Sequence, residues 1–584
     1  MNKQIVARPM NPASGLSESG LAPLLQRIYS SRGVTDCAEL DNSLKGLLPY
    51  HTLRDIEPAV AQISRAIEAR ERILVVGDFD CDGATSSALA VAALRALGAT
   101  WAGYLVPNRF EYGYGLSPEI VAVAQQQSPD LLITVDNGIS SVEGVRAAKG
   151  LGIRVVVTDH HLPGDELPAA DALVNPNQQG CEFRGKNTCG VGVIFYVMTA
   201  VCRELQQRGW FARQGLAVPN MADFLDLVAL GTVADVVPLD HNNRIFVDQG
   251  LKRIRAGRCR PGIAALAEIG GRTLSKLVAA DLGFAIAPRL NAAGRLEDMS
   301  IGIECLLTQS PDEARRLALQ LDELNQDRKQ IEQQMQSQAL SILAGMKLDA
   351  DSGANAELPY GITLFEPDWH EGVVGILASR IKERLHRPVI AFAQTEEGQV
   401  KGSARSIPGL HIRDTLDAIA ARHPELLNKF GGHAMAAGMS LDMEHFERFR
   451  KAFDDEVRRR LQPEQLLARI ETDGCLNTAE MSLNTAQQLR DGGPWGQLFP
   501  EPLFEGTFEI VQQRILKERH LKLVLAEPGN SQNFCVDAIA FNVDLDDWPS
   551  DASQVKVAYK LDINEFKGRV SLQLLVDYLQ PVGG

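Results

Sequence analysis

Short apolar runs alternate with helix-length segments between residues 70 and 175. The runs are ILVVG at 73–77, LLITVD at 131–136, IRVVVTD at 153–159 and a shorter one at 172–175. Runs rich in β-branched residues, separated by segments such as 86–97, are typical of buried strands in a parallel sheet. The pattern predicts an α/β domain, which residues 221–239 continue as a helix that breaks near Gly231.

A different spacing begins at Pro311, where apolar residues fall three, four or seven apart among charged and amide side chains. They are Leu317, Leu321, Leu324, Ile331 and Met335. This spacing predicts one long amphipathic helix. The acidic, Gly/Ala-rich sequence LDADSGANAELP follows it, and a new α/β pattern starts at Gly361, so the helix is expected to connect two domains.

The last hundred or so residues carry strand-like runs at 508–511, 521–525, 536–541 and 570–576, with turn residues between them. A small β-barrel is the natural interpretation. The patterns together divide the chain into five parts. These are an N-terminal segment (1–50), a first α/β domain (51–310), a connecting helix (311–350), a second α/β domain (351–465) and the barrel (466–584).

Composition narrows the class of protein. The 584 residues allow about four domains, and 45% hydrophobic with 23% charged residues is close to the soluble average, which excludes disordered chains, collagen and coiled-coil rods. Nine cysteines without a CxxC pair suit a reduced cytoplasmic protein. No apolar run approaches the ~20 residues of a membrane span, and the first residues lack a signal-peptide core, so neither membrane insertion nor secretion is expected.

Acidic residues gather directly after the first predicted strand, where GDFDCDGATS places Asp78, Asp80 and Asp82 at alternate positions. In open parallel sheets, ligands bind at this edge. An ordinary turn explains one or two acids, but three within five residues repel one another unless a cation compensates them. An EF-hand loop would need two flanking helices, whereas a strand precedes this segment.

The next two strands end in the same way, at Asp136-Asn137-Gly138 and at Asp159-His160-His161. Asp235 lies in an otherwise apolar stretch, where an unpaired carboxylate would be costly to bury. Oxygen ligands with one or two imidazoles favour Mg²⁺ or Mn²⁺ over structural zinc, and the acids suffice for two ions that share a bridging group. Two such ions suit in-line displacement at phosphorus, so the residues predict phosphoryl hydrolysis.

The motifs GDFDCDGATS, VDNG, TDHH and GTVADVVPL resemble the four successive motifs of the DHH phosphoesterase superfamily. Downstream, APRLNAAGRL, HEGVVGILASR, GSARS and GGHAMAAG resemble the DHHA1 substrate-binding domain of its RecJ-type members. The resemblance runs in order over nearly the whole chain. It implies a DHH catalytic domain, the connecting helix, a DHHA1 domain and a C-terminal oligonucleotide-binding (OB) barrel.

The resemblance also implies roles for single residues. Metal binding falls to Asp80, Asp82, Asp136, His160 and Asp235, with Asp136 as the bridge and Asp78 as a supporting member of the site. His161 then faces the scissile phosphate, and Asp159 belongs to the catalytic set as the group that orients ligands. Cys81 is more plausible as a small apolar filler than as a thiolate ligand.

Substrate binding is expected from cations, hydrogen-bonding side chains and small residues. The Gly/Ala-rich sequence GGHAMAAG at 431–438 would by itself be more typical of tight helix packing. The resemblance is what favours phosphate binding there. The implied residues are Arg109, Arg289, Asn291, Arg295, His370, Ser403, Arg405, Gly432 and His433. In the barrel, Lys517, Arg519, His520, Lys522 and Lys567 are candidates to follow a single strand, or else form only a solvated face.

The resemblance implies a cytoplasmic, monomeric exonuclease that uses two Mg²⁺ or Mn²⁺ ions to degrade single-stranded DNA in the 5′→3′ direction, in recombination and repair. Single-stranded-DNA-binding protein is its expected partner. The net charge of −15 is compatible with this, because binding depends on local patches and metals neutralise the acidic cluster. Two alternatives are a pyrophosphatase or small-nucleotide phosphodiesterase, for which the barrel is hard to explain, and a non-enzymatic replication scaffold, which would be expected to lack several ligands.

Overall fold

The computed structural model describes residues 3–11, 15–18, 20–108, 115–351, 358–395, 399–529, 534–543, 548, 552–566 and 568–582. The chain forms two compact units. The larger unit comprises Arg8–Asn325 and Asp473–Gly584, and the smaller unit comprises Met1–Ala7 and Gln326–Thr472. Among the described residues, no helix is both long enough and apolar enough to cross a membrane.

A five-stranded parallel sheet forms the centre of the first α/β domain, in the order β3-β2-β4-β5-β6. Its strands are β2 (Arg72–Val76), β3 (Trp101–Leu105), β4 (Leu131–Val135), β5 (Arg154–Thr158) and β6 (Ala172–Val174). The four predicted strands are confirmed, and β3 joins them at the sheet edge. Because β2 lies between β3 and β4, the strand order reverses there, and ligands bind beyond the carboxyl ends of strands at such a point.

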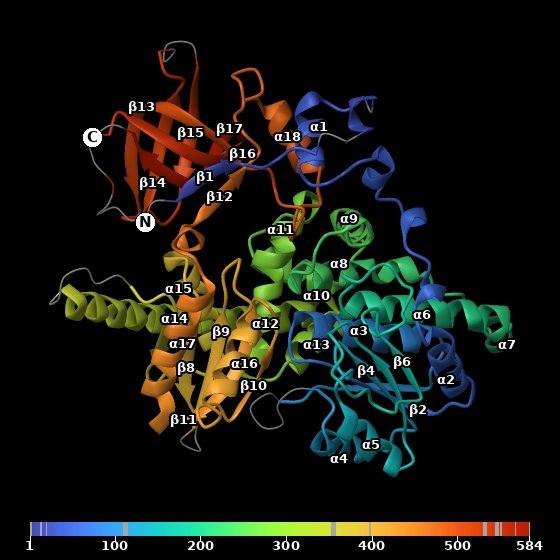
Figure 1. The fold of residues 1–584 in the computed structure, drawn as a ribbon. Coiled ribbons are helices and arrows are strands. Elements are labelled where there is room, and N and C mark those ends of the chain that lie inside the picture. The colour runs from blue at the N-terminus through green and yellow to red at the C-terminus, as the bar shows by residue number, and fades with distance from the viewer. Residues whose placement is uncertain are drawn as a thin grey trace. The chain divides into compact units, whose positions relative to one another are not determined.

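Helices cover both faces of this sheet (Figure 1). Ile73 and Val75 of β2 belong to the main core, whereas Leu74 and Val76 belong to a separate cluster on the opposite face. The main core is packed by α2 (Ile56–Glu68), α3 (Cys81–Ala96), α6 (Gly190–Gln207) and α8 (Leu225–Ala234). The other face is covered by α4 (Pro118–Gln125) and α5 (Val142–Gly150).

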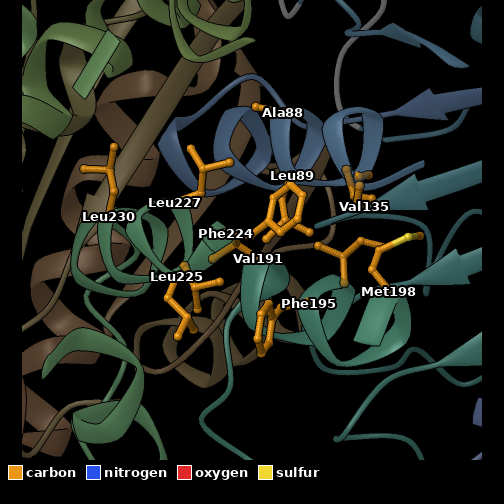
Figure 2. Packing of buried hydrophobic residues seen from close by; sticks show 14 of the residues in the cluster. Ala88, Leu89, Val135, Val191, Phe195, Met198, Phe224, Leu225, Leu227 and Leu230 are labelled. Atoms are coloured by element: carbon orange, nitrogen blue, oxygen red, sulfur yellow. The ribbon is translucent and has the colours of Figure 1, made fainter. Parts of the chain in front are cut away.

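Close packing of α3, α6 and α8 fixes the part of the core next to the carboxyl ends of the strands. Figure 2 shows Leu89 of α3, Val191 of α6 and Leu227 of α8 gathered in this core. Helix α8 continues through Gly231 to Ala234, so the predicted break near Gly231 is wrong. A Cβ atom at Gly231 would lie 2.4 Å from Thr85 Oγ1 and 2.6 Å from Val191 Cγ1, which means that this glycine permits the close packing of the three helices.

The rest of the larger unit's first part is helical. Its helices are α1 (Pro23–Ser30), α7 (Trp210–Gln214), α9 (His241–Arg255), α10 (Pro261–Ile269), α11 (Ala279–Asp281), α12 (Ala287–Leu296) and α13 (Ser300–Leu307). A π-helical turn, η7 (Leu282–Ile286), leads into α12. The predicted long helix is confirmed as α14 (Pro311–Asp351), which passes from the larger unit into the smaller one.

A closed five-stranded barrel forms the C-terminal part of the larger unit, in the order β13-β14-β15-β17-β16. Its strands are β13 (Phe504–Leu516), β14 (His520–Ala526), β15 (Cys535–Ala540), β16 (Gln554–Phe566) and β17 (Arg569–Pro581). Helix α18 (Leu483–Asp491) precedes it. Leu24 and Ile28 of α1 pack into the same core as Phe504 and Tyr559, so the barrel core includes residues from the start of the chain.

The smaller unit contains a mixed sheet in the order β10-β11-β9-β8-β7. The strands are β7 (Ile362–Phe365), β8 (Val389–Gln394), β9 (Gln399–Arg405), β10 (Lys429–Gly432) and β11 (Ala436–Asp442). Its helices are α15 (Val374–Leu385), α16 (Ile412–Arg422) and α17 (Phe446–Arg460). In a separate two-stranded ladder, β1 (Gln4–Ala7) pairs in parallel with β12 (Arg469–Thr472).

Candidate active site

The acidic motif after β2 turns directly into helix α3. Asp80 is the N-cap of this helix, and its carboxylate accepts a hydrogen bond of 3.0 Å from Gly83 N–H. Asp82 is buried in the first turn, where its two carboxylate oxygens accept hydrogen bonds from Gly190 N–H (2.7 Å) and Val191 N–H (3.0 Å). These donors belong to the first turn of α6, whose positive dipole end stabilises the Asp82 charge.

Asp136 follows β4 with a left-handed backbone, at φ 60°, and is buried. It lies against the start of α6, because a Cβ atom at Gly190 would come within 2.6 Å of Asp136 Cβ. The neighbouring Asn137 amide donates to Val76 O (3.1 Å) and to Val135 O (2.9 Å). These bonds join the carboxyl ends of β2 and β4, so the two acidic segments are held side by side.

Asp159, at the end of β5, organises the two histidines that follow it. Its carboxylate accepts hydrogen bonds from Ile139 N–H (2.8 Å), His160 N–H (2.7 Å) and His161 N–H (3.1 Å), and it contacts His161 Nδ1 at 2.8 Å. Burial opposes ionisation of Asp159, but the hydrogen bond and charge of His161 outweigh burial, so its pKa is lowered. Burial also opposes the charged form of His161, and Asp159 outweighs it to raise the His161 pKa.

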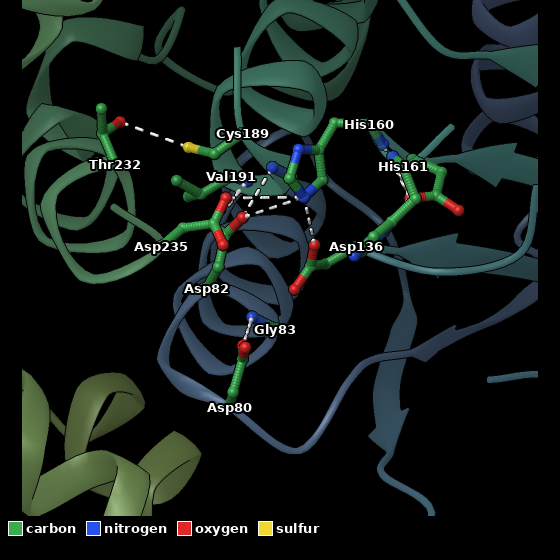
Figure 3. Close-up of polar contacts among 12 residues, drawn as sticks. Asp80, Asp82, Gly83, Asp136, His160, His161, Cys189, Val191, Thr232 and Asp235 are labelled. Carbon is green, nitrogen blue, oxygen red and sulfur yellow. Dashed lines mark hydrogen bonds and ion pairs between the residues drawn. The ribbon is translucent and has the colours of Figure 1, made fainter. Parts of the chain in front are cut away.

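Carboxylates from α3, from the end of β4 and from the end of α8 surround the His160 ring, which follows β5 (Figure 3). His160 Nε2 lies 3.1 Å from Asp136 Oδ1, 3.6 Å from Asp235 Oδ2 and 3.9 Å from Asp82 Oδ2. Asp235 reaches this point as the C-cap of α8. The structure therefore brings together side chains that are up to 157 positions apart in the sequence, from Asp78 to Asp235.

Three overlapping groups of side chains have ligand atoms within 4.8 Å of one another. Asp78, Asp80 and Asp136 form one group; Asp82, His160 and Asp235 form the second; Asp136, His160 and His161 form the third. Asp136 is shared by the first and third groups, and His160 by the second and third. We call the residues Asp78, Asp80, Asp82, Asp136, His160 and Asp235 the metal cluster, and its arrangement suits two cations that share a ligand.

The electrostatics of the metal cluster favour a bound cation. Burial, together with the charge of Asp80, raises the pKa of Asp82 to about 7. Burial and the surrounding carboxylates raise the pKa of Asp136 and of Asp235 well above the usual range. The Oδ2 atom of Asp235 is buried and takes part in no hydrogen bond among the described residues. Buried oxygen donors of like charge, with one imidazole, are a donor set that fits Mg²⁺ or Mn²⁺.

Two buried cysteines lie next to the cluster. Burial raises the pKa of Cys81 and of Cys189 well above the ordinary thiol value, and Cys189 Sγ lies 3.3 Å from Thr232 Oγ1. Neutral, buried thiols act as small apolar side chains. This environment agrees with the interpretation of Cys81 as a filler.

Helix α12 contacts the backbone of the acidic segment 78–82. Cys81 N–H donates to Asn291 Oδ1 at 2.8 Å, and a Cβ atom at Gly294 would lie 1.7 Å from Phe79 O. Asn291, predicted to bind substrate, thus bonds the backbone between two acids of the cluster. Arg289 forms an ion pair of 2.7 Å with Asp322 and also donates to Ala285 O, and Arg295 on the same helix is half-buried.

The smaller unit brings its own predicted residues together. Arg405 donates to Ser403 Oγ (3.0 Å) and to Ala404 O (2.7 Å), and burial lowers its pKa. The start of α15 packs on this pair, since a Cβ atom at Gly375 would lie 2.8 Å from an Arg405 nitrogen. On the same segment that leads into α15, His370 Nδ1 accepts a hydrogen bond of 3.0 Å from Gly372 N–H.

The hairpin β10–β11 completes this arrangement. Gly432 has φ 146°, and a Cβ atom there would lie 2.4 Å from Ala436 O, so only glycine fits. His433 N–H donates to Ala436 O at 2.8 Å, and Ala436 is opposite Arg405 in the sheet. We call the residues His370, Ser403, Arg405, Gly432 and His433 the cradle. The remaining predicted cation, Arg109, lies outside the described residues.

Candidate nucleic-acid contacts of the barrel surround one end of β14. Lys517 and Arg519 are exposed in the turn between β13 and β14. His520 packs edge-on against Phe541, with ring centroids 5.1 Å apart, and Lys522 forms an ion pair of 3.2 Å with Asp537. Lys567 lies outside the described residues.

Known domain families match three segments of the chain. The DHH family, N-terminal domain, matches residues 72–232; the DHHA1 domain matches residues 358–459; and the RecJ OB domain matches residues 472–578. The single-stranded-DNA-specific exonuclease RecJ of Escherichia coli is 55% identical over 563 residues, which cover 96% of both chains. The chain belongs to the RecJ family.

Further RecJ relatives support this assignment. The single-stranded-DNA-specific exonuclease RecJ of Haemophilus influenzae is 53% identical over 96% of both chains. The crystal structure of RecJ from Thermus thermophilus in complex with Mn²⁺ aligns with a TM-score of 0.78 at 30% identity, covering all of this chain and 80% of that one. The DHH, DHHA1 and OB architecture expected from the sequence is confirmed.

Sequence reasoning missed several residues that shape this RecJ-family site. The backbone N–H groups of Gly190 and Val191 hold Asp82, and Gly231 lets α8 approach it. Neither glycine carries a chemical group that suggests a role. The only available signal is the small-residue sequence CGVG at 189–192, which resembles an ordinary helix start.

Proposed function

We propose that this chain is a metal-dependent exonuclease that degrades single-stranded DNA to mononucleotides in the 5′→3′ direction, in recombination and repair. Membership of the RecJ family supports the substrate and the reaction. The observation that carries the proposal is the metal cluster, in which Asp136 belongs to two ligand groups at once. A scaffold on the same fold would not need to hold so many buried carboxylates together.

Two Mg²⁺ or Mn²⁺ ions are the proposed cofactors, as the metal complexes of the T. thermophilus relative also suggest. Asp78 and Asp80 with Asp136 would hold one ion, and Asp82, His160 and Asp235 with Asp136 the other. When bound, such a pair activates water and neutralises charge on the leaving oxygen. The chain's part is to keep each carboxylate oriented, through Gly83 N–H for Asp80 and the α6 N–H groups for Asp82.

His161 is proposed to stabilise charge on the scissile phosphate. Its Nδ1 atom is fixed by Asp159, and its raised pKa favours the imidazolium, which attracts an anion. The side chain is 35% exposed, whereas that of His160 is 14% exposed. Asp159 is then a positioning residue, because its hydrogen bonds orient both histidines.

Polarity is proposed to come from recognition of the 5′-terminal phosphate. In the cradle, the Arg405 guanidinium and the Ser403 hydroxyl are donors of the kind that bind phosphate, and Gly432 adds no side chain beside them. Arg109, Arg289 and Arg295 belong to the larger unit and stay separate predictions from the sequence as phosphate contacts; Arg289 would have to exchange Asp322 for the phosphate.

The barrel is proposed to bind the strand away from the cut site. Lys517 and Arg519 supply positive charge, and the pair His520 and Phe541 supplies ring surface for bases. Single-stranded-DNA-binding protein is the proposed partner, and we propose that the enzyme acts as a monomer in the cytoplasm. The proposed domain division is that of the sequence: 1–50, 51–310, 311–350, 351–465 and 466–584.

The decisive assay follows single-stranded DNA, duplex DNA and RNA, each labelled at the 5′ or the 3′ end, with Mn²⁺ or Mg²⁺. We expect 5′-labelled single strands to release labelled mononucleotide first, while 3′-labelled strands shorten progressively. Asp136→Asn provides the inactive control. Internal cuts, or first release from the 3′ end, would contradict the proposal, and hydrolysis of pyrophosphate or dinucleotides alone would favour the small-substrate alternative.

A further inference from the structure

Phe284 is a strongly exposed aromatic residue in a turn that packs on the helices α8 and α12. Phe284 is 85% exposed, more than any other large apolar side chain among the described residues. It lies in the π-helical turn η7. Because apolar surface gains free energy when it leaves water, a ligand that covers this ring would bind more tightly.

The turn η7 packs on the end of α8. A Cβ atom at Gly283, next to Phe284, would lie 3.2 Å from Val233 Cγ1. Val233 precedes the cluster residue Asp235 by two positions. The turn also leads directly into α12, where Asn291 accepts the hydrogen bond from Cys81 N–H. The turn that carries Phe284 therefore packs on α8, which ends at Asp235, and continues into α12, which bonds the backbone between Asp80 and Asp82.

Unusual backbone conformation accompanies this exposure. π-Helical turns are rare and often occur at functional sites. Directly after Asp235, Val236 has φ 59° and is 63% exposed, and a β-branched residue in the left-handed region is a genuine outlier. Strain of this kind persists where the surrounding structure fixes the backbone for a purpose. Val236 directly follows the cluster residue Asp235, and the π-helical turn packs on α8 and leads into α12.

We propose that Phe284 stacks on a base of the single strand whose phosphate occupies the metal cluster, a role that rests on the proposed function. A phosphate drawn to the cluster turns its bases outward, where a neighbouring ring can cover one of them. Aromatic stacking accepts any base, as an exonuclease that is not sequence-specific requires. Arg289, on the helix that follows the turn, donates to Ala285 O and is paired with Asp322.

The test compares wild type, Phe284→Ala, Phe284→Trp and Phe284→Leu on 5′-phosphorylated oligothymidine with Mn²⁺. A second set of strands carries a single abasic residue at each of positions one to six from the 5′ end. Leu151→Ala, which removes a 47% exposed side chain at the end of α5, is the matched control. Melting temperature and Mn²⁺ stoichiometry are measured for every variant to verify the fold and the cluster.

We expect Phe284→Ala to lower kcat/KM by about 5- to 150-fold, the range for one lost base stack, with Phe284→Trp restoring it better than Phe284→Leu. At one abasic position, wild type should fall to the level of Phe284→Ala, and the variant should lose nothing more. Equal losses at every abasic position, or none in Phe284→Ala, would overturn the stacking role while leaving exonuclease activity intact. If wild type degrades no single strand, the proposed function fails, and this inference fails with it.

Discussion

His160 Nε2 lies 3.1 Å from Asp136 Oδ1, so the imidazole from the end of β5 meets the carboxylate from the end of β4 at the centre of the metal cluster. The same nitrogen lies 3.6 Å from Asp235 Oδ2. This contact joins the two ligand groups that would otherwise be separate. A change at either residue should therefore affect both metal positions.

Asp136→Asn should abolish hydrolysis, because an amide keeps the shape of the side chain but loses the charge that two cations would share. We expect less than about 1% of wild-type rate at saturating Mn²⁺, in line with the loss of a major electrostatic contributor. Initial rates and calorimetric metal stoichiometry measure this. Asp312→Asn, at an exposed position in α14, should leave both unchanged. A variant that still binds two ions with wild-type affinity would rule out the bridging role.

The two histidines should give different defects. His160→Ala should lose activity that excess Mn²⁺ partly restores, because its nitrogen lies among the cluster carboxylates. His161→Ala should keep metal affinity and lose about 10²–10³-fold in kcat, as expected for one lost donor to developing charge. Metal titrations of the steady-state rate distinguish them. Coincident titration curves would remove this division of roles.

Stabilisation of the protein by Mn²⁺ should increase with pH. Burial and Asp80 raise the pKa of Asp82 from 3.8 to about 7, so its folded-state pKa is above the unfolded value. The metal-free fold binds the proton more tightly than the unfolded chain, and this contribution to stability is lost as pH rises from about 4 to about 7. A cation needs the ionised form. The Mn²⁺-induced rise in Tm should therefore grow over this range.

Thermal unfolding with and without Mn²⁺ at several pH values from about 4 to about 7 measures this dependence. Asp82→Asn removes the titrating group and should flatten the metal-free pH dependence in the same range. A Mn²⁺ effect that is independent of pH would show that protons do not compete for the cluster.

Gly190→Ala should damage the metal cluster without adding any chemical group. The new methyl group would lie 2.6 Å from Asp136 Cβ, so Asp136 or the start of α6 must move. We expect a destabilisation of about 1–3 kcal/mol, typical of overpacking, and a weaker Mn²⁺ affinity. Gly150→Ala in α5 is the matched control, since nothing lies within 4 Å of its Cβ position, and helix propensity should make it neutral or stabilising. Similar Mn²⁺ affinity in both variants would contradict the packing argument.

Charge in the turn between β13 and β14 should control salt dependence. Replacing both Lys517 and Arg519 by alanine should reduce the steepness of the plot of log affinity against log salt concentration by about 1.4. This value assumes that each residue makes one phosphate contact, which contributes about 0.7 on a single strand. Fluorescence anisotropy with long and short oligothymidine measures this. Lys45→Ala, an exposed cation in another part of the larger unit, should leave the slope unchanged. An unchanged slope in the double variant would exclude this turn from DNA binding.

The sequence alone predicts the side chains of the site better than it predicts their surroundings. Asp136 and His160 follow β-branched runs, and the geometry of a parallel sheet brings such strand ends to one edge. Asp235 stands out because a carboxylate in an apolar stretch needs a partner. The donors to Asp82 come instead from the start of α6, which tertiary packing brings from a distant part of the chain.

Close approach of backbones is equally invisible in a linear sequence. From helix propensity, Gly231 is expected to interrupt a helix. In the structure it lies inside α8, where its lack of a side chain lets the helix pack close to Thr85. Strand β3 lacks the β-branched run that identifies its neighbours, since WAGYL mixes a glycine with aromatic residues. From the sequence alone, Arg289 is a candidate to bind phosphate, but in the structure it forms an ion pair with Asp322 of α14.

The pairing of β1 with β12 has a consequence for the order of events on the ribosome. Every metal-cluster residue lies between Asp78 and Asp235, so that part of the chain has emerged long before the partner of β1 is translated. Gln4 can pair only after Arg469 has been synthesised, and closing so long a loop carries an entropic cost. During synthesis, β1 is an unpaired strand, open to wrong partners. We expect β1 to join β12 late in folding, after the nascent chain can already bind its metals.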